Sequence, residues 1–198
     1  MDTQKLENNL RKKGFDFARF ATGAEAADYV AASLSGKTVG MGGSVTMGQI
    51  GLYEKLVKNN RVIWHIHDGK TDEIMLAACN AEVYITSANA VSENGDILNI
   101  DGRGNRLAGT LMRKEKVYII VGVNKVAPDF ESALERARNV AAPLNCKRLE
   151  TKTPCAVSDH CFDCASPERI CNALLVLWRK PYWCDSMEVI LVDEELGY

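Results

Sequence analysis

The sequence predicts an α/β fold in which helices cover a mostly parallel sheet. Apolar strand-like runs alternate with amphipathic helix-like segments between residues 15 and 87, which is the pattern of βα units. A later run, KVYIIVGVN, is almost continuously apolar, as expected of a central strand buried on both faces. The 198 residues contain no internal repeat and no long linker. We therefore expect a single domain over 1–198, with a cysteine-rich C-terminal segment over 146–171.

The elements of the first half follow from the spacing of apolar residues. Leu6 and Leu10 lie four positions apart among charged residues, which predicts a helix that Gly14 ends. Val30 and Leu34 show the same spacing in GAEAADYVAASL. In chain order we expect a helix over 3–13, a strand over 15–22, a helix over 23–34, a strand over 37–43, a helix over 51–60, a strand over 61–66, a helix over 71–80 and a strand over 81–87.

The second half starts with a different pattern. The Asn94-Gly95 pair favours a tight hairpin turn between two short extended pieces. Pro128 is expected to open a helix over 128–144 that Pro143 ends. The remaining elements are expected to be strands over 116–124, 170–183 and 187–198.

Composition excludes several classes of protein. The chain is 46% hydrophobic and has 24 basic and 26 acidic residues, so its formal net charge is only -2. Such a balanced charge does not indicate a nucleic-acid or membrane partner. The N-terminal stretch is polar and lacks the apolar region of a secretory signal, and no apolar stretch reaches the length of a membrane span. We expect a cytoplasmic protein.

A glycine-rich turn, MGGSVTMG, lies between the first expected buried strand and the helix that follows it. Glycines allow a sharp bend that exposes successive N–H groups, and a helix N-terminus favours negative charge. Gly42, Gly43, Ser44 and Thr46 are therefore candidate ligands of an anion. The spacing matches neither common nucleotide-binding loop. The alternative is a tight turn whose glycines only permit close helix-to-sheet packing.

Polar residues gather after the middle strands, where open α/β sheets bind ligands. Asn89 and Asp101 are candidate binding residues, Glu93 a candidate base or carboxylate nucleophile, and Arg106 a candidate clamp for an anion. Lys125 follows the apolar strand and is expected at the same edge. The alternative is a solvated hairpin whose charges only maintain solubility.

Two histidines, His65 and His67, alternate in WHIHDG and would share one face of a strand. A two-histidine metal edge is conceivable, but no third ligand has a spacing that requires it.

Taken together, GGSVTMGQIGL, AEVYITSANAVSENGDILNIDGRGNR, VYIIVGVNKVAPDFESALERAR and TPC with the following cysteines resemble the LUD domain (DUF162-like) of lactate-utilisation proteins. The resemblance implies a three-layer Rossmann-like sandwich of the NagB/RpiA/CoA transferase-like superfamily. In that superfamily the first glycine-rich turn holds phosphate or a similar anion, which corresponds here to Gly42, Gly43, Ser44 and Thr46. The nearest counterparts of its catalytic residues are Glu93, Asp101, Arg106 and Lys125, although the superfamily's catalytic motifs are not literally present.

The resemblance also implies a function in organic-acid (lactate) oxidation or electron transfer. The expected partners are a small anionic metabolite and iron–sulfur electron-transfer proteins, and a homo-oligomer is left open. Two alternatives remain: a non-catalytic metabolite-binding or complex subunit with a structural metal, and an isomerase or CoA-transferase-like enzyme.

Four cysteines lie within seventeen residues in the pattern C-x5-C-x2-C-x6-C: Cys155, Cys161, Cys164 and Cys171. Four thiolates can complete a [4Fe–4S] cluster or a tetrahedral zinc site. The single C-x2-C pair and the resemblance to an electron-transfer family favour the iron–sulfur cluster, with zinc as the alternative. Reduced thiols or a redox-active disulfide are the third reading.

Overall fold

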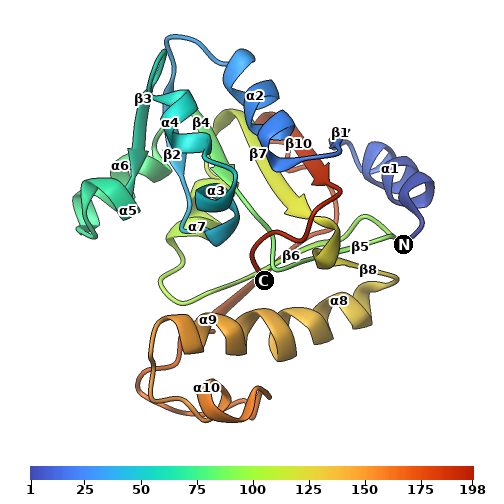
Figure 1. The fold of residues 1–198 in the computed structure, drawn as a ribbon, viewed down its shortest axis with the longest axis vertical. Coiled ribbons are helices and arrows are strands. Elements are labelled where there is room, and N and C mark those ends of the chain that lie inside the picture. Colours follow the sequence, from blue (N-terminus) through green and yellow to red (C-terminus); the bar gives the residue numbers. More distant parts are fainter.

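The computed structural model describes residues 1–198 and contains a larger, fully parallel sheet (Figure 1). Every neighbouring pair of its strands is parallel, so all six carboxyl ends meet at one edge. In spatial order the strands are β1 (Asp16–Phe20), β10 (Cys184–Val192), β7 (Lys114–Gly122), β4 (Val83–Thr86), β2 (Thr38–Met41) and β3 (Arg61–Trp64). The predicted α/β class with a mostly parallel sheet is confirmed.

Helices cover one face of this sheet. Apolar side chains of α2 (Gly23–Ala32), α3 (Val45–Gln49) and α4 (Leu52–Leu56) pack there against alternate strand residues such as Tyr118 and Ile120. The intervening residues of the same strand, such as Val117, face the opposite side. Strand β7 is therefore buried on both faces, which explains its continuous apolar sequence.

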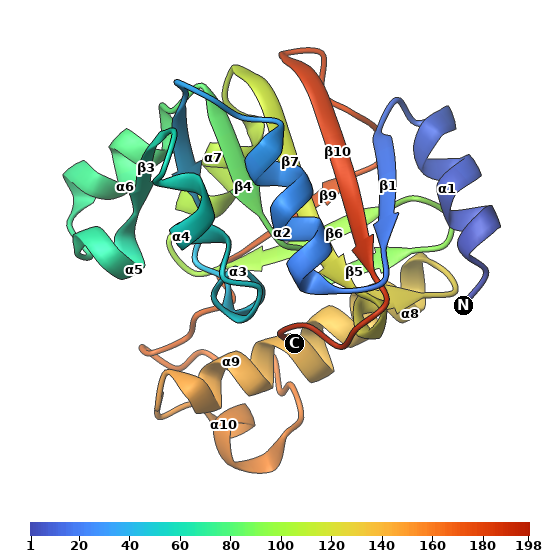
Figure 2. The same cartoon turned by 45° about the horizontal axis from the view of Figure 1, so that its top comes forward.

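A second, smaller sheet covers much of the opposite face, together with α1 (Thr3–Lys12). Its strands, in spatial order, are β8 (Val126–Ala127), β5 (Ala90–Ser92), β6 (Ile97–Asp101) and β9 (Ala173–Leu177). Strands β5 and β6 form the predicted hairpin, and Gly95 in its turn has φ +83°, a value that favours glycine. Helix α8 (Phe130–Arg136) packs on the outer face, so the molecule is layered as helices, sheet, sheet and helix (Figure 2).

Strand order reverses between β2 and β4. The chain passes from β2 outward to β3 and then returns to form β4 on the other side of β2. Such a reversal leaves a crevice between the two diverging connections at the carboxyl ends of the strands. The glycine turn follows β2, Ser87 follows β4 and Lys125 follows β7, so the topology brings the three segments to one edge.

Several predicted elements were wrong in extent. The strand expected over 187–198 starts and ends earlier, because β10 runs from Cys184 to Val192. Strand β3 ends at Trp64, and His65–Asp68 forms the short helix α5, so His65 and His67 do not share a strand face. The helix expected to end at Pro143 continues through a π-helical stretch (Ala137–Ala141) into α9 (Ala142–Arg148). Pro143 follows directly on this π-helical stretch, where the regular i→i−4 hydrogen bonds are already shifted, so its missing N–H does not end the helix. Of the strand expected over 170–183, only β9 forms.

Four short helices complete the structure. Helices α6 (Asp72–Cys79) and α7 (Asn105–Leu111) pack together, the 3₁₀ turn η1 (Val123–Lys125) follows β7, and α10 (Pro154–Ser158) follows α9. Neither α3 nor α7 was predicted, because both lie in glycine-rich stretches that read as loops. None of the helices has both the length and the apolar character needed to cross a membrane.

Candidate functional site

The glycine turn after β2 is held closely against the neighbouring strands. The Gly42 N–H donates to the Ile85 carbonyl at 2.9 Å, and the Gly42 carbonyl accepts from Trp64 Nε1 at 3.1 Å. A Cβ on Gly42 would lie 3.1 Å from the Tyr84 hydroxyl and 3.3 Å from Arg106 Cγ. A larger side chain at this position would crowd these groups unless they shifted.

The next two N–H groups of the turn are uncommitted. The backbone nitrogens of Gly43 and Ser44 donate no hydrogen bond, and both residues are half-buried. Ser44 is the N-cap of α3, but its side chain forms no cap hydrogen bond. Free N–H groups that are partly shielded from water are donors suited to an anionic oxygen.

Lys125 lies opposite this turn, at the end of η1. It is only 3% exposed, and its Nζ donates to Ser87 Oγ at 2.9 Å and to Thr46 Oγ1 at 3.0 Å. No carboxylate pairs with this amine. Burial, reinforced by the positive charges of Arg136 and Arg106, lowers the pKa of Lys125 to about 7. The site thus contains a buried amine that titrates near neutrality and lacks a negative partner.

Arg106 and two of the other predicted residues form one cluster beside the turn. Arg106 Nε lies 3.5 Å from Asp101 Oδ2, and its Nη2 donates to Asn89 Oδ1 at 3.4 Å and to the Ile100 carbonyl. The other Asp101 oxygen accepts from the N–H groups of Arg103 and Gly104 at 3.0 Å. Asp101 is therefore neutralised by its own neighbours and fixes the position of Arg106.

Arg136, which the sequence did not indicate, closes the site from α8. Its Nη1 donates to the Asn89 carbonyl at 2.5 Å, and its Nε donates to the Asn124 carbonyl at 2.7 Å. Burial lowers the pKa of Arg136 as well. The sequence does not mark Arg136 as a site residue, because its hydrogen bonds to Asn89 and Asn124 depend on how α8 packs against the second sheet.

His65 is the second residue that sequence reasoning did not place here. A Cβ on Gly43 would lie 3.1 Å from the His65 ring, so the imidazole covers the turn directly. Burial, followed by the nearby charges of Lys70 and Arg103, lowers the pKa of His65. The ring is therefore neutral at physiological pH and can accept a proton.

The C-terminal segment covers the buried amine. The Gly197 N–H donates to Gln49 Oε1 at 2.6 Å, and the Leu196 N–H donates to Asn124 Oδ1 at 3.1 Å. A Cβ on Gly197 would lie 2.7 Å from Thr46 Oγ1 and 3.1 Å from Lys125 Nζ. This segment separates Lys125 and Thr46 from solvent.

Glu93 does not join this cluster. It lies at the tip of the β5–β6 hairpin, where its carboxylate accepts from the Asp2 N–H at 2.7 Å and from Lys5 Nζ at 3.4 Å. Its carbonyl accepts from Asn9 Nδ2 at 2.9 Å. Glu93 therefore fastens α1 to the hairpin, while the predicted residues brought together are Gly42, Gly43, Ser44, Thr46, Asn89, Asp101, Arg106 and Lys125.

The cysteine-rich segment lies apart from this cluster, beyond α9. Cys155 is buried, Cys161, Cys164 and Cys171 are half-buried, and none forms a disulfide. Burial raises the pKa of Cys155, and the neighbouring thiols of Cys146 and Cys164 raise it further. Burial also raises the pKa of Cys171, with Cys161 and Cys164 nearby.

These thiols share one region but are not arranged as ligands. No group of three or more His, Cys, Asp or Glu side chains is close enough to hold one metal ion. The four-cysteine metal site therefore stays a prediction.

Comparison with known proteins agrees with this architecture. A crystal structure of a DUF162 family protein from Deinococcus radiodurans matches with a TM-score of 0.57, covering 96% of this chain and 95% of that chain at 13% identity. At this identity the likeness shows the fold alone. No curated protein matches the chain. The model of the LUD domain matches residues 3–192. The chain therefore belongs to the LUD domain family, which is connected with lactate utilisation.

Proposed function

We propose that the cluster around Lys125, Gly43, Ser44 and Arg106, called the strand-end site below, binds the carboxylate of a small 2-hydroxy or 2-oxo acid of the lactate class. The observation that carries this proposal is Lys125, a buried amine with two hydroxyl partners and no acid. A buried charge without a partner is costly, so an anion that reaches the amine gains a strong interaction. Because Gly197 covers Lys125, the C-terminal segment has to move aside when the acid binds. The free N–H groups of Gly43 and Ser44 supply further donors on the same side of the sheet.

Asn99 supports a ligand that also carries a hydroxyl group. Its Nδ2 donates to the Ser87 carbonyl at 3.2 Å, whereas its Oδ1 is the one buried side-chain oxygen or nitrogen without a hydrogen-bond partner. Buried acceptors are normally satisfied. A hydroxyl donor beside Ser87 would satisfy this oxygen, and a 2-hydroxy acid has its hydroxyl next to its carboxylate.

Oxidation of such an acid to a 2-oxo acid releases two electrons and two protons. One proton comes from the hydroxyl group and one from C2. The neutral His65 ring, held over Gly43, is suited to accept one of them, and water takes the other. The electrons require an acceptor. An iron–sulfur cluster takes one electron at a time, so the two electrons would leave in two single steps. The acceptor would be an iron–sulfur partner protein or a cluster held by Cys155, Cys161, Cys164 and Cys171.

The cysteine-rich segment after α9 (residues 149–171), called the thiol segment below, has donor chemistry that fits either metal. Four thiolates suit a [4Fe–4S] cluster, for which the cysteines would have to move closer together, and zinc suits the same set. A bound cluster supplies one-electron transfer, whereas zinc would be structural. The rival function is a metabolite-binding subunit in a complex, in which the site binds the same acid without turnover.

The location of Glu93 weighs against a CoA-transferase-like reaction. Such chemistry needs a carboxylate that can attack the bound substrate. Glu93 is engaged with α1, and Asp101 is engaged with Arg106 and two backbone N–H groups.

Calorimetric titration of L-lactate, pyruvate and propionate tests the binding site. Lys125→Met should weaken binding of all three about 100-fold, because the acid loses its buried cationic partner. Propionate, which lacks the hydroxyl, should bind more weakly than lactate to the unmodified protein. Lys58→Met is the matched control, since Lys58 is exposed and makes no ion pair. Unchanged binding in Lys125→Met would refute the proposed site.

Purification under nitrogen followed by metal analysis tests the thiol segment. A brown protein absorbing at about 400 nm, with iron and sulfide, supports electron transfer. A colourless protein with stoichiometric zinc supports the structural role and the non-catalytic subunit. A protein without metal supports the third alternative, reduced thiols or a redox-active disulfide.

A further inference from the structure

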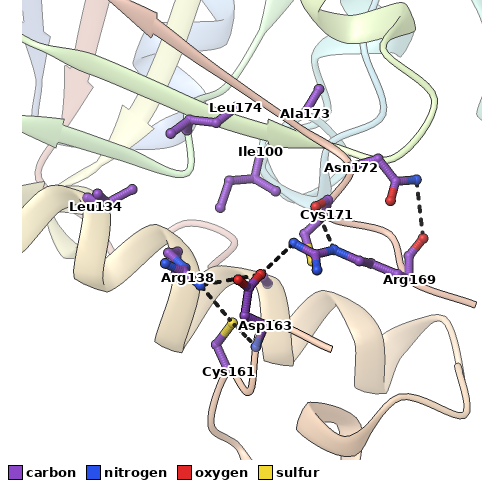
Figure 3. A pocket seen from close by; sticks show the side chains of 11 residues that line it. Ile100, Leu134, Arg138, Cys161, Asp163, Arg169, Cys171, Asn172, Ala173 and Leu174 are labelled. Atoms are coloured by element: carbon purple, nitrogen blue, oxygen red, sulfur yellow. Dashed lines mark hydrogen bonds and ion pairs between the residues drawn. The ribbon is translucent and has the colours of Figure 1, made fainter. Parts of the chain in front are cut away.

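A cavity of about 310 Å³ lies between the second sheet, the long helix and the thiol segment (Figure 3). Its wall on the sheet side is formed by Ile100 and Leu174, its wall on the helix side by Leu134 and Ala142. The thiol segment lines another side with Cys161, Asp163, Arg169 and Cys171, and the cavity is partly open to solvent. The volume is at the lower end of the range of about 300–1,000 Å³ that is typical of small-molecule sites.

The sheet and helix walls of the cavity form its apolar floor. Ile100 and Leu134 pack against a small core cluster on one side and face the cavity on the other. Leu174 is 46% exposed although it stands in a strand. These side chains gain free energy only when something covers them.

The two arginines at the rim have different roles. Arg169 is fully engaged: its Nε donates to the Cys171 carbonyl at 3.0 Å, its Nη1 to the Cys164 carbonyl at 2.7 Å and its Nη2 to Asp163 at 2.9 Å. Arg169 therefore fixes the conformation of the loop from Asp163 to Cys171.

Arg138 is almost free by comparison. Its Nη2 lies 3.8 Å from Cys161 Sγ and 3.6 Å from Asp163 Oδ1, and it makes no other polar contact. Its remaining N–H groups have no acceptor, and Asp163 is shared with Arg169 (Figure 3). Two guanidinium groups thus face one carboxylate, which leaves one positive charge uncompensated beside an apolar floor.

We propose that this cavity is a second binding site, which takes an organic anion with an apolar body. The carboxylate of the ligand pairs with Arg138, whose planar fork matches a carboxylate in geometry. Its apolar part covers Ile100, Leu134 and Leu174. A lactate-sized acid would leave most of the volume empty, so the ligand is larger than the acid proposed for the strand-end site.

This site is independent of the strand-end site. Arg136 and Arg138 are two residues apart, yet Arg136 donates to Asn89 and Asn124 while Arg138 faces the cavity. Ile100 separates the two sites: its carbonyl accepts from Arg106, and its side chain lines the cavity.

Calorimetric titration with 4-phenylbutyrate and with its neutral amide tests the proposal. The unmodified protein should bind the carboxylate at least tenfold more tightly than the amide. Arg138→Gln should remove that preference, and Arg179→Gln should retain it because Arg179 is exposed and lies outside the cavity. Lys125→Met should also retain it. Equal affinity for acid and amide in the unmodified protein would overturn the proposal, and so would an unaffected preference in Arg138→Gln.

Methyl NMR locates the bound probe without any substitution. Shift changes should concentrate on Ile100, Leu134 and Leu174. Changes concentrated on Ile50 and Leu52, near the glycine turn, would place the ligand elsewhere and refute the cavity site.

Discussion

The strand-end site and the thiol segment were both indicated by polar or reactive residues, but they are built in different ways. The first is assembled from the ends of β2, β4 and β7, with Lys125 fixed by two hydrogen bonds of 3.0 Å or less. The second follows α9 as an irregular run with one short helix, α10, and is held largely by Arg169 and by side-chain contacts of Asp163.

The difference shows what fixes the geometry of a site. Neighbouring parallel strands force their carboxyl ends together, so residues that follow them must meet. A loop with close sequence spacing imposes no such requirement, and no three of the possible metal ligands in it come together. We expect the strand-end site to be rigid and the thiol segment to depend on what it binds.

The largest expected effect is at Gly40, which lies in β2 just before the glycine turn. A Cβ there would lie 2.0 Å from the Ala78 carbonyl oxygen of α6, so Gly40→Ala should lower the free energy of unfolding by about 3 kcal/mol or more. Urea denaturation measures the loss. Gly48→Ala is the control. A Cβ on Gly48 would meet no atom of a packed neighbour within 4 Å, so this substitution should leave the stability of the protein unchanged or raise it by about 0.5–1 kcal/mol. Similar free energies of unfolding for the two variants would contradict the rigid packing of α6 against β2.

The next effect is the pH dependence of acid binding. The pKa of Lys125 is about 7 in the free protein, and the acid binds the protonated amine. Since the carboxylate of lactate is ionised throughout, affinity should fall about tenfold from pH 6 to pH 8 as the amine loses its proton. Titrations across this range measure it.

Two variants assign this dependence to the amine. Lys125→Met should remove it, while His65→Gln should keep it, because burial lowers the pKa of His65 and the ring is already neutral over most of this range. An affinity that rises with pH would show that the neutral amine is the binding form.

A smaller effect is expected at the thiol segment if it holds a metal. In that case, treatment of anaerobically purified protein with a chelator should speed tryptic cleavage after the exposed Lys152 several-fold, because the segment would lose its bound group. Mass spectrometry of the fragments gives the rate. Cleavage after Lys116, inside the sheet, is the internal control and should stay slow. An unchanged rate after Lys152 would mean that the segment is ordered without metal.

The smallest effect is expected at Glu93. Glu93→Gln keeps an acceptor for the Asp2 N–H but loses the charge that faces Lys5, so the protein should lose less than about 1 kcal/mol of stability. Lactate affinity should stay within about twofold of the unmodified protein, because Glu93 contacts α1 and not the strand-end site. A large loss of lactate binding would indicate that Glu93 does contribute to the strand-end site.

Sequence alone determined the fold class, the β5–β6 hairpin and the edge of the sheet at which polar residues gather. Those features depend on local patterns: alternation of strands and helices, a turn pair such as Asn94-Gly95, and apolar runs such as KVYIIVGVN. The same patterns gave Gly42, Thr46, Arg106 and Lys125 as residues of one edge.

Only the tertiary structure decided which polar residues meet. Glu93 and Asn89 are four positions apart, yet one contacts α1 and the other contacts Arg106, because the hairpin carries its tip away from the sheet. His65 and Arg136 enter the site through the packing of α5 and α8, which no local pattern encodes. Whether an amine is buried, and hence the pKa of Lys125, depends on every segment that packs around it, and sequence spacing carries no information about that environment.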